Sequence, residues 1–327
     1  MPSLVRRALL AALLVFTASS CVLVTGDIDP LSRRPRPLTE RVVSGSGRAK
    51  ILLLDLTGVI TSEESSGPLG IGGSESAVAR LDAELVLAAE DDDVRAIVVR
   101  INSPGGTVTA SDIIYQRLMR FKAEHGVPVL VQMMDVAASG GYYSALAGDE
   151  IVATPTTVTG SIGVIFNNVS VAGLMEKLGV RDQTVASGAM KDIGSPLRTM
   201  TPAEREVLEK LIGDFQSRFV ALVRERRPTL TPEMSATMTD GRVFSADQAL
   251  QGGLVDSIGY LDDTITRAKT RAGVSEARVV RYRRANEFDD GIYARAGAPA
   301  QVTQVSLLNF ENRLLPSGPN FLYLWAP

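Results

Sequence analysis

The chain of 327 residues contains a single histidine and a single cysteine, and this scarcity excludes several kinds of site. His125 follows a helical pattern and precedes Gly126, a residue typical of helix ends, so a Ser-His-Asp triad is not expected. Because His125 and Cys21 stand far apart, clusters of metal ligands are lacking and no metal site is expected. A phosphate-cradling loop is also lacking, so no cofactor is predicted.

Neither sign of charge is in large excess: the chain has 34 Lys and Arg and 37 Asp and Glu, so its net charge is −3. The sequence has no basic stripe and no aromatic platform, so nucleic acid is not an expected partner. The remaining composition, 45% hydrophobic and 22% charged, is ordinary for a globular enzyme. The length allows one large domain or two.

The segment DVAASGGYY, Asp135 to Tyr143, places Ser139 among small residues with two glycines directly behind it. Small neighbours let a substrate backbone approach closely, and Gly140 leaves its amide free to face a developing oxyanion. The segment therefore suits a nucleophile. It suits the glycine-rich start of a buried helix equally well.

Two other segments contain what a nucleophilic serine needs. INSPGG, Ile101 to Gly106, closes an apolar strand-like run and precedes a helical pattern, a turn whose free N–H groups suit a second oxyanion donor. SGAMKD, Ser187 to Asp192, contains Lys191 among small and apolar residues. A lysine can act as general base where burial disfavours its charged form, which makes Lys191 the candidate base. The alternative is a surface ion pair between Lys191 and Asp192.

These segments together resemble the bacterial signal peptide peptidase A family over roughly residues 50 to 275. Their order and spacing are more specific than any one of them, since INSPGG also resembles the Clp protease. The resemblance is carried by INSPGG, DVAASGGYY, TGSIGV from Thr159, SGAMKDIGSP from Ser187 and GRVFSADQALQGGLVDSIG from Gly241.

The resemblance assigns roles to individual residues. Ser139 matches the family nucleophile, and Lys191, 52 positions later, matches its general base. The amides of Gly106 and Gly140 match the oxyanion donors. Ser161 matches a serine that helps to hold the lysine amine, with a helix-capping hydroxyl as the alternative.

Short apolar strands alternate with helical patterns, which indicates an α/β fold with a mostly parallel, buried sheet and flanking helices. The resemblance specifies a crotonase-like spiral fold shared with the Clp protease. Thr201, Pro202 and Glu204 form a capping signature for a long helix. The sequence predicts strands at 51–56, 94–101, 127–132, 151–153 and 180–186, and helices at 76–90, 110–124 and 201–227.

The N-terminal residues 1–21 have the pattern of a secretory signal, with Arg6 and Arg7 before an apolar run that ends in small residues. Cys21 at that junction resembles the lipidated cysteine of a bacterial lipoprotein, although Ala18 replaces the usual leucine. The alternative is an uncleaved transmembrane anchor from Ala8 to Gly26. Both interpretations place a membrane-anchored catalytic domain on the periplasmic side of the cell envelope.

The rest of the chain is expected to form a tether at 22–48, a peptidase domain at 49–275 and a C-terminal extension at 276–327. A Gly- and Ser-rich stretch at 62–74 suggests a loop. The apolar end of the chain, 319–327, resembles the family's tail. It is expected either to make an oligomer contact or to dock in a groove and regulate access.

These observations predict a membrane-associated serine endopeptidase that hydrolyses extended apolar peptides, and the resemblance implies cleaved signal peptides as substrates. Short family members form rings in which serine and lysine meet across a subunit boundary, so the resemblance implies a homo-oligomer of about eight subunits. Two other classes stay open: a noncatalytic membrane scaffold and an acyl-CoA enzyme of the same fold.

Overall fold

The computed structural model describes residues 37–64, 75–285, 287, 291–293 and 321–325. The chain divides into two units, 1–37 and 38–327, and the account below concerns the second. The expected signal segment or anchor, and most of the expected loop at 62–74, lie outside the described residues.

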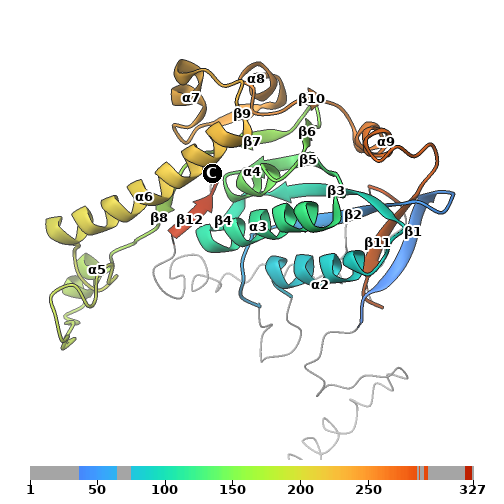
Figure 1. Cartoon of the computed structure of the whole chain (residues 1–327). Coiled ribbons are helices and arrows are strands. Elements are labelled where there is room, and N and C mark those ends of the chain that lie inside the picture. Colours follow the sequence, from blue (N-terminus) through green and yellow to red (C-terminus); the bar gives the residue numbers. More distant parts are fainter. Residues whose placement is uncertain (1–36, 65–74, 286, 288–290, 294–320, 326–327) are drawn as a thin grey trace, which may run out of the picture. The chain divides into compact units, whose positions relative to one another are not determined.

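A mostly parallel sheet forms the centre of this unit (Figure 1). Its strand order is β1-β11-β2-β3-β5-β6-β10, and β7 joins it by pairing with β5 and β9. All neighbours are parallel except the pairs β1–β11 and β7–β9. The strands are β1 (Thr39–Gly45), β2 (Lys50–Thr57), β3 (Val94–Ser103), β5 (Val129–Ala138), β6 (Glu150–Ala153), β7 (Val158–Gly160), β9 (Val243–Ser245), β10 (Ser257–Ile258) and β11 (Arg278–Arg283).

Helices cover both faces of the sheet because its central strands are apolar on both sides. In β2, Leu52 and Leu54 pack on the side of α2 (Ala77–Ala89) and α3 (Val108–His125), whereas Ile51 and Leu53 pack on the side of α9 (Leu261–Arg271). Figure 1 shows α2 and α3 on one face and α9 on the other. Each such buried side chain stabilises the fold by about 1.5–3 kcal/mol.

A second, small sheet has the order β4-β12-β8, with β4 at Gly105–Thr107, β12 at Phe321–Leu324 and β8 at Ile165–Phe166. After β8 the chain extends away from both sheets, and it returns through α6 (Pro202–Arg226). Figure 1 shows α6 extending past the main sheet. Among the described residues no helix combines the length and apolar character needed to span a bilayer. The other helices are α4 (Gly140–Ala145), α5 (Ala172–Lys177), α7 (Pro232–Met238) and α8 (Ala246–Gln251).

The structure confirms the α/β fold and most of the predicted elements. Strands lie at the predicted positions near 51–56, 94–101, 127–132 and 151–153, and helices near 76–90, 110–124 and 201–227. The α6 capping box is formed, because the Thr201 hydroxyl accepts from the Glu204 amide while the Glu204 carboxylate accepts from the Thr201 amide.

Two expectations about individual segments differ from the structure. The strand predicted at 180–186 is wrong: this stretch has no regular structure, and Val185 is 97% exposed. Its apolar residues have no neighbouring strand to pair with. Part of the expected tether, Thr39–Gly45, is strand β1, and it carries no apolar period because it is an exposed edge strand.

Candidate active site

Ser139 stands between β5 and α4, in a backbone conformation that is unusual for a non-glycine residue. Its φ is 51° and its ψ is −113°. The conformation is held by its amide, which donates to the Gly160 carbonyl at 2.8 Å, and by its carbonyl, which accepts from the Tyr143 amide at 2.8 Å. The sharp turn places the Ser139 side chain at the end of β5, where it is 1% exposed. Its Oγ has no hydrogen-bond partner among the described residues, which is uncommon for a buried hydroxyl.

Ser161 lies beside Ser139. Strands β5 and β7 pair in parallel with Ala138 opposite Gly160, so the next residues on the two strands are neighbours. Ser161 also has a φ of 51°, and its amide donates to the Arg242 carbonyl at 2.7 Å. It caps none of the described helices, so the helix-capping alternative does not apply.

The N–H group of Gly106 faces the side of β4 opposite Ile60. On one side of β4 the Ile60 amide donates to the Gly105 carbonyl, and the Thr107 amide donates to the Ile60 carbonyl, each at 2.9 Å. The amide of Gly106 therefore faces the opposite side. A Cβ on Gly106 would lie 1.9 Å from the Ile60 oxygen, so only glycine fits there.

Gly140 places a second amide at the same point. A Cβ on Gly140 would lie 3.1 Å from the Gly106 nitrogen, and a Cβ on Gly105 would lie 2.7 Å from the Gly140 nitrogen. The sequence predicted two oxyanion donors from segments about 35 residues apart. The fold brings these two amides together.

Strand β12, from the apolar tail, lies directly on this pair of amides. It runs antiparallel to β4 with Tyr323 opposite Gly106, and the Trp325 amide donates to the Pro104 carbonyl at 2.8 Å. Because hydrogen-bonding pairs alternate along an antiparallel ladder, Tyr323 and Gly106 form the next such pair. The Tyr323 carbonyl oxygen also lies 3.1 Å from the position of a Cβ on Gly140. The Tyr323 carbonyl therefore lies close to both glycines, and Tyr323 pairs with Gly106 across the β4–β12 ladder.

Lys191 lies in an exposed turn between α5 and α6, away from Ser139. Since Ser139 Oγ has no partner among the described residues, the Lys191 amine does not reach it within one chain. The segment that carries Lys191 lies beyond the end of the main sheet in Figure 1. The expected alternative, an ion pair with Asp192, is not found, because Asp192 pairs with Arg198 at 2.7 Å.

Hydrogen bonds from Arg198 connect the loop around Lys191 to the start of α6. Arg198 donates to both carboxylate oxygens of Asp192, at 2.7 and 2.9 Å, and to the Glu204 carboxylate at 2.8 Å. These hydrogen bonds from Arg198, with others from Thr201, lower the pKa of Glu204 to about 2. Arg198 therefore joins the residue next to Lys191 to the first turn of a long helix.

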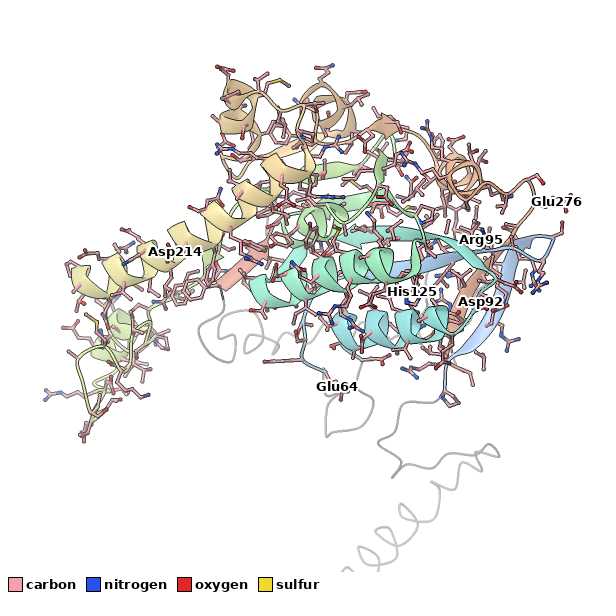
Figure 2. The ribbon with its side chains drawn as sticks, viewed as in Figure 1. Glu64, Asp92, Arg95, His125, Asp214 and Glu276 are labelled. Atoms are coloured by element: carbon pink, nitrogen blue, oxygen red, sulfur yellow. The ribbon has the colours of Figure 1, made fainter. Side chains whose placement is uncertain are left out.

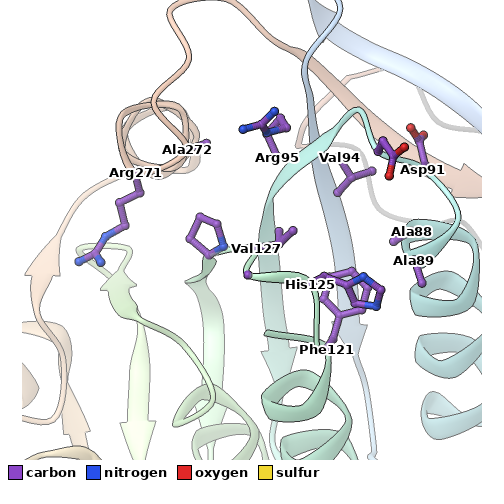
Figure 3. A pocket seen from close by; sticks show the side chains of 13 residues that line it. Ala88, Ala89, Asp91, Val94, Arg95, Phe121, His125, Val127, Arg271 and Ala272 are labelled. Carbon is purple, nitrogen blue, oxygen red and sulfur yellow. The ribbon is translucent and has the colours of Figure 1, made fainter. Parts of the chain in front are cut away.

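His125 lies at the other edge of the sheet. It is the last residue of α3, shortly before β5 begins, whereas Ser139 comes just after β5 ends, and the ten-residue strand between them spans about 33 Å. Figure 2 labels His125 near Arg95 and Asp92, and these residues line a cavity of about 300 Å³ with Phe121 (Figure 3). The His125 and Phe121 rings lie 4.5 Å apart. The histidine is therefore not available to Ser139.

The sequence did not single out the aromatic residues around Tyr323. They are Tyr143, on α4, and Phe215 and Phe219, on α6. The one sequence feature that could have indicated them is the pair Tyr142-Tyr143, which ends the segment DVAASGGYY. Their partners stand more than 70 positions further along the chain, so no local pattern joins them.

Comparisons with known proteins identify the family to which the chain belongs. The model of Peptidase family S49 matches residues 122–275, and that of the Clp protease matches residues 73–159. A protein of Enterococcus faecium named "Putative signal peptide peptidase SppA" is 34% identical over 75% of this chain and 70% of its own length. Protease 4 of Salmonella typhi is 35% identical over 67% of this chain, which spans about a third, 34%, of that protein.

Among solved structures, a mutant of the 1510-N membrane-bound stomatin-specific protease, in complex with a substrate peptide, aligns with a TM-score of 0.41 and 18% identity. The alignment covers 68% of this chain and 81% of that one. The fold and the matches define a serine-type endopeptidase with a Clp-protease-like α/β domain. The chain belongs to peptidase family S49, with signal peptide peptidase A among its relatives.

Proposed function

We propose that this chain is a Ser-Lys dyad endopeptidase in which Ser139 is the nucleophile and Lys191 the general base. The observation that carries the proposal is the buried Ser139 hydroxyl, which has no hydrogen-bond partner among the described residues and directly precedes Gly140, whose backbone lies close to that of Gly106. A hydroxyl in this position needs only a base to become a nucleophile.

The reaction follows from these roles. Ser139 Oγ attacks the substrate carbonyl as the uncharged amine of Lys191 takes its proton, and the amides of Gly106 and Gly140 hold the oxyanion. Lys191 then protonates the leaving amine, and the acyl-enzyme is hydrolysed by a water that Lys191 activates. Ser161, next to Ser139, is suited to orient the lysine amine.

We propose that Lys191 acts on the Ser139 of a neighbouring subunit in a homo-oligomeric ring of about eight subunits. The exposed position of Lys191 supports this assignment, since a base needs a cover that one chain does not provide. The same segment exposes large apolar side chains, which is unusual for a surface that stays in water. They are Val169, Leu174, Leu178, Val180, Val185 and Met190.

The substrates in this proposal are extended apolar peptides, with cleaved signal peptides as the physiological class. An antiparallel strand on β4 supports an extended binding mode, because β12 already lies there in that form. We further propose that the catalytic domain lies on the periplasmic side, anchored by a lipid on Cys21 or by an N-terminal helix. The expected signal at 1–21 belongs to the same proposal. The domain extends beyond the expected bounds of 49 and 275, because β1 of the expected tether 22–48 and β11 of the expected extension 276–327 are strands of the main sheet.

A fluorophosphonate probe tests the central claim. We expect the purified full chain to be labelled at Ser139, and the Ser139→Ala and Lys191→Ala variants to lose both labelling and peptide hydrolysis. Hydrolysis that persists in Ser139→Ala would refute the proposal. Absence of labelling in the wild-type chain would favour a noncatalytic scaffold, and binding of coenzyme A would favour an acyl-CoA enzyme.

A further inference from the structure

Ser103, the last residue of β3, is a fully buried polar residue that the reaction above does not use. Its backbone pairs with Ala137 of β5, two positions before Ser139. The chain turns directly after it into β4, which contains Gly106. Ser103 therefore lies between the strand that leads to the nucleophile and the strand that provides a proposed oxyanion amide.

The Ser103 hydroxyl joins two main-chain segments. It donates to the Gly58 carbonyl, just after β2, at 2.6 Å, and it accepts from the Gly105 amide at 3.0 Å. A serine hydroxyl has one donor hydrogen and also accepts, so both capacities are used here. The end of β3 is thereby bonded to the segment after β2 and to the first residue of β4.

The segment after β2 in turn supports β4 on one side. The Ile60 amide donates to the Gly105 carbonyl, and the Thr107 amide donates to the Ile60 carbonyl, each at 2.9 Å. The amide of Gly106, between these two residues, faces the opposite side. A displacement of Gly58 or Gly105 would therefore move the Gly106 amide.

The turn into β4 has no bulky side chains of its own to fix its shape. Gly105 has a φ of 105°, a conformation that residues with side chains rarely adopt, and Gly106 follows it directly. The position of such a turn depends on its hydrogen bonds. The Gly105 amide makes its bond with a side chain, that of Ser103.

Ser103 also packs against the helix that follows the nucleophile. A Cβ on Gly141, the second residue of α4, would lie 2.8 Å from the Ser103 carbonyl oxygen and 3.5 Å from Ser103 Cβ. Since α4 begins directly after Ser139, Ser103 contacts both the strand of the proposed oxyanion amide and the helix next to the nucleophile.

We propose that Ser103 is a positioning residue of this enzyme, whose hydroxyl holds the Gly106 amide where the oxyanion develops. The inference rests on the proposed function and adds a residue to its site. An oxyanion donor stabilises the transition state because it is aligned beforehand, and a misplacement of about 1 Å costs on the order of 100-fold in rate. Without the hydroxyl, the Gly58 carbonyl and the Gly105 amide both lose a partner, so the turn can move.

Steady-state kinetics of the full chain test this role. We expect Ser103→Ala to lower kcat about 10- to 100-fold and to change KM less than about threefold, because the lost alignment acts on the transition state. The control is Thr157→Val, which removes an equally buried hydroxyl that donates to main-chain carbonyls of β5, at 2.6 Å to Met134. It should lower the Tm about as much as Ser103→Ala but change kcat less than about twofold.

A pair of inhibitors separates positioning from general support of the fold. Ser139 Oγ adds to the carbonyl carbon of a peptide aldehyde while its proton passes to Lys191, so the aldehyde oxygen becomes an oxyanion. The corresponding peptide alcohol binds without this addition. We expect Ser103→Ala to weaken binding of the aldehyde by about the same factor as kcat, and binding of the alcohol by less than about threefold.

Equal losses of aldehyde and alcohol affinity, or a kcat no lower than that of Thr157→Val, would overturn the inference. If circular dichroism shows that Ser103→Ala does not fold, Ser103→Cys takes its place, because a thiol is only a weak donor and acceptor, and the same pattern is expected. If the wild-type chain is neither labelled at Ser139 nor active, the proposed function fails and this inference fails with it. If the wild-type chain is labelled and active but Ser103→Ala behaves like the control, the positioning role fails alone.

Discussion

Arg198 donates two hydrogen bonds, of 2.7 and 2.9 Å, to the carboxylate of Asp192. Asp192 adjoins Lys191, the residue proposed as the base, in a stretch that has no helix or strand of its own. The same arginine also binds Glu204 in the first turn of α6. The position of the proposed base is therefore set by an ion pair rather than by secondary structure.

Replacement of this arginine should reduce catalysis far more than stability. We expect Arg198→Ala to lower kcat/KM by about 10- to 100-fold, because a small displacement of a catalytic group costs that much. The Tm should change little, since the loop lies outside the packed sheet. Steady-state kinetics and thermal unfolding measure the two effects.

The matched control is Arg205→Ala on the same helix. Arg205 is 67% exposed and makes only a 4.0 Å contact with Glu209, so its loss should leave both activity and Tm unchanged. Equal effects of the two substitutions would contradict a positioning role for Arg198.

Acid should loosen the same network. The pKa of Glu204 is lowered from 4.5 to about 2 by its hydrogen bonds, first of all that from Arg198, so ionised Glu204 stabilises the folded loop. Its contribution is fully present above about pH 4.5 and is lost as the pH falls towards 2. Hydrogen exchange in residues 188–204, measured between pH 5 and 2.5, should therefore accelerate beyond its intrinsic pH dependence.

A Glu204→Gln variant should lose most of this extra pH dependence and keep the part due to Asp192, whose pKa is also lowered by its hydrogen bonds from Arg198. Glu209→Gln should keep it in full, since Glu209 is 65% exposed. An unchanged profile in Glu204→Gln would show that another group controls the loop.

A methyl group at position 140 should block the proposed oxyanion site. The Cβ of Gly140→Ala would lie 2.3 Å from Ser111 Oγ and 3.1 Å from the Gly106 nitrogen. We expect kcat to fall by about 10² to 10³, the loss typical of one oxyanion donor. Circular dichroism verifies the fold, and Gly173→Ala, whose Cβ would meet nothing within 4 Å, serves as the control.

Mixed oligomers test whether the dyad crosses a subunit boundary. Ser139→Ala and Lys191→Ala chains are each expected to be inactive, but co-expression should restore activity. Random mixing in a ring gives about a quarter of the sites an intact serine and an intact lysine. No recovery in verified mixed particles would place both residues of a working dyad in one chain.

The sequence predicts most of the fold because the central strands are apolar and short. The consecutive residues 51–54 form an apolar run typical of a strand that is buried on both faces: Leu52 and Leu54 pack on one side of the sheet, and Ile51 and Leu53 on the other. The long helix α6 was predicted because its capping box is local. The strand expected at 180–186 failed, because apolar residues such as Val185 indicate burial without saying whether the chain itself or a partner provides the cover.

The candidate site is predictable to a lesser degree. Ser139 and its glycine were recognisable because small residues around a nucleophile are a local requirement. The cluster of aromatic residues around Tyr323 was not, since it joins Tyr143, Phe219 and Tyr323 from positions far apart in the sequence. Contact between these rings depends on how the C-terminal strand β12 pairs with β4. No periodicity in the sequence predicts that pairing. The role of Lys191 stays a prediction.

The covalent attachment of β12 to the domain affects how any assay of this enzyme is interpreted. A tethered segment meets its binding site at an effective concentration on the order of millimolar, whatever the dilution of the protein. A peptide added at micromolar concentration competes against that local excess. If substrates bind along β4 as proposed, the apparent KM of the intact chain therefore includes the displacement of its own terminus, and a dissociation constant is best measured on a variant whose terminus binds weakly.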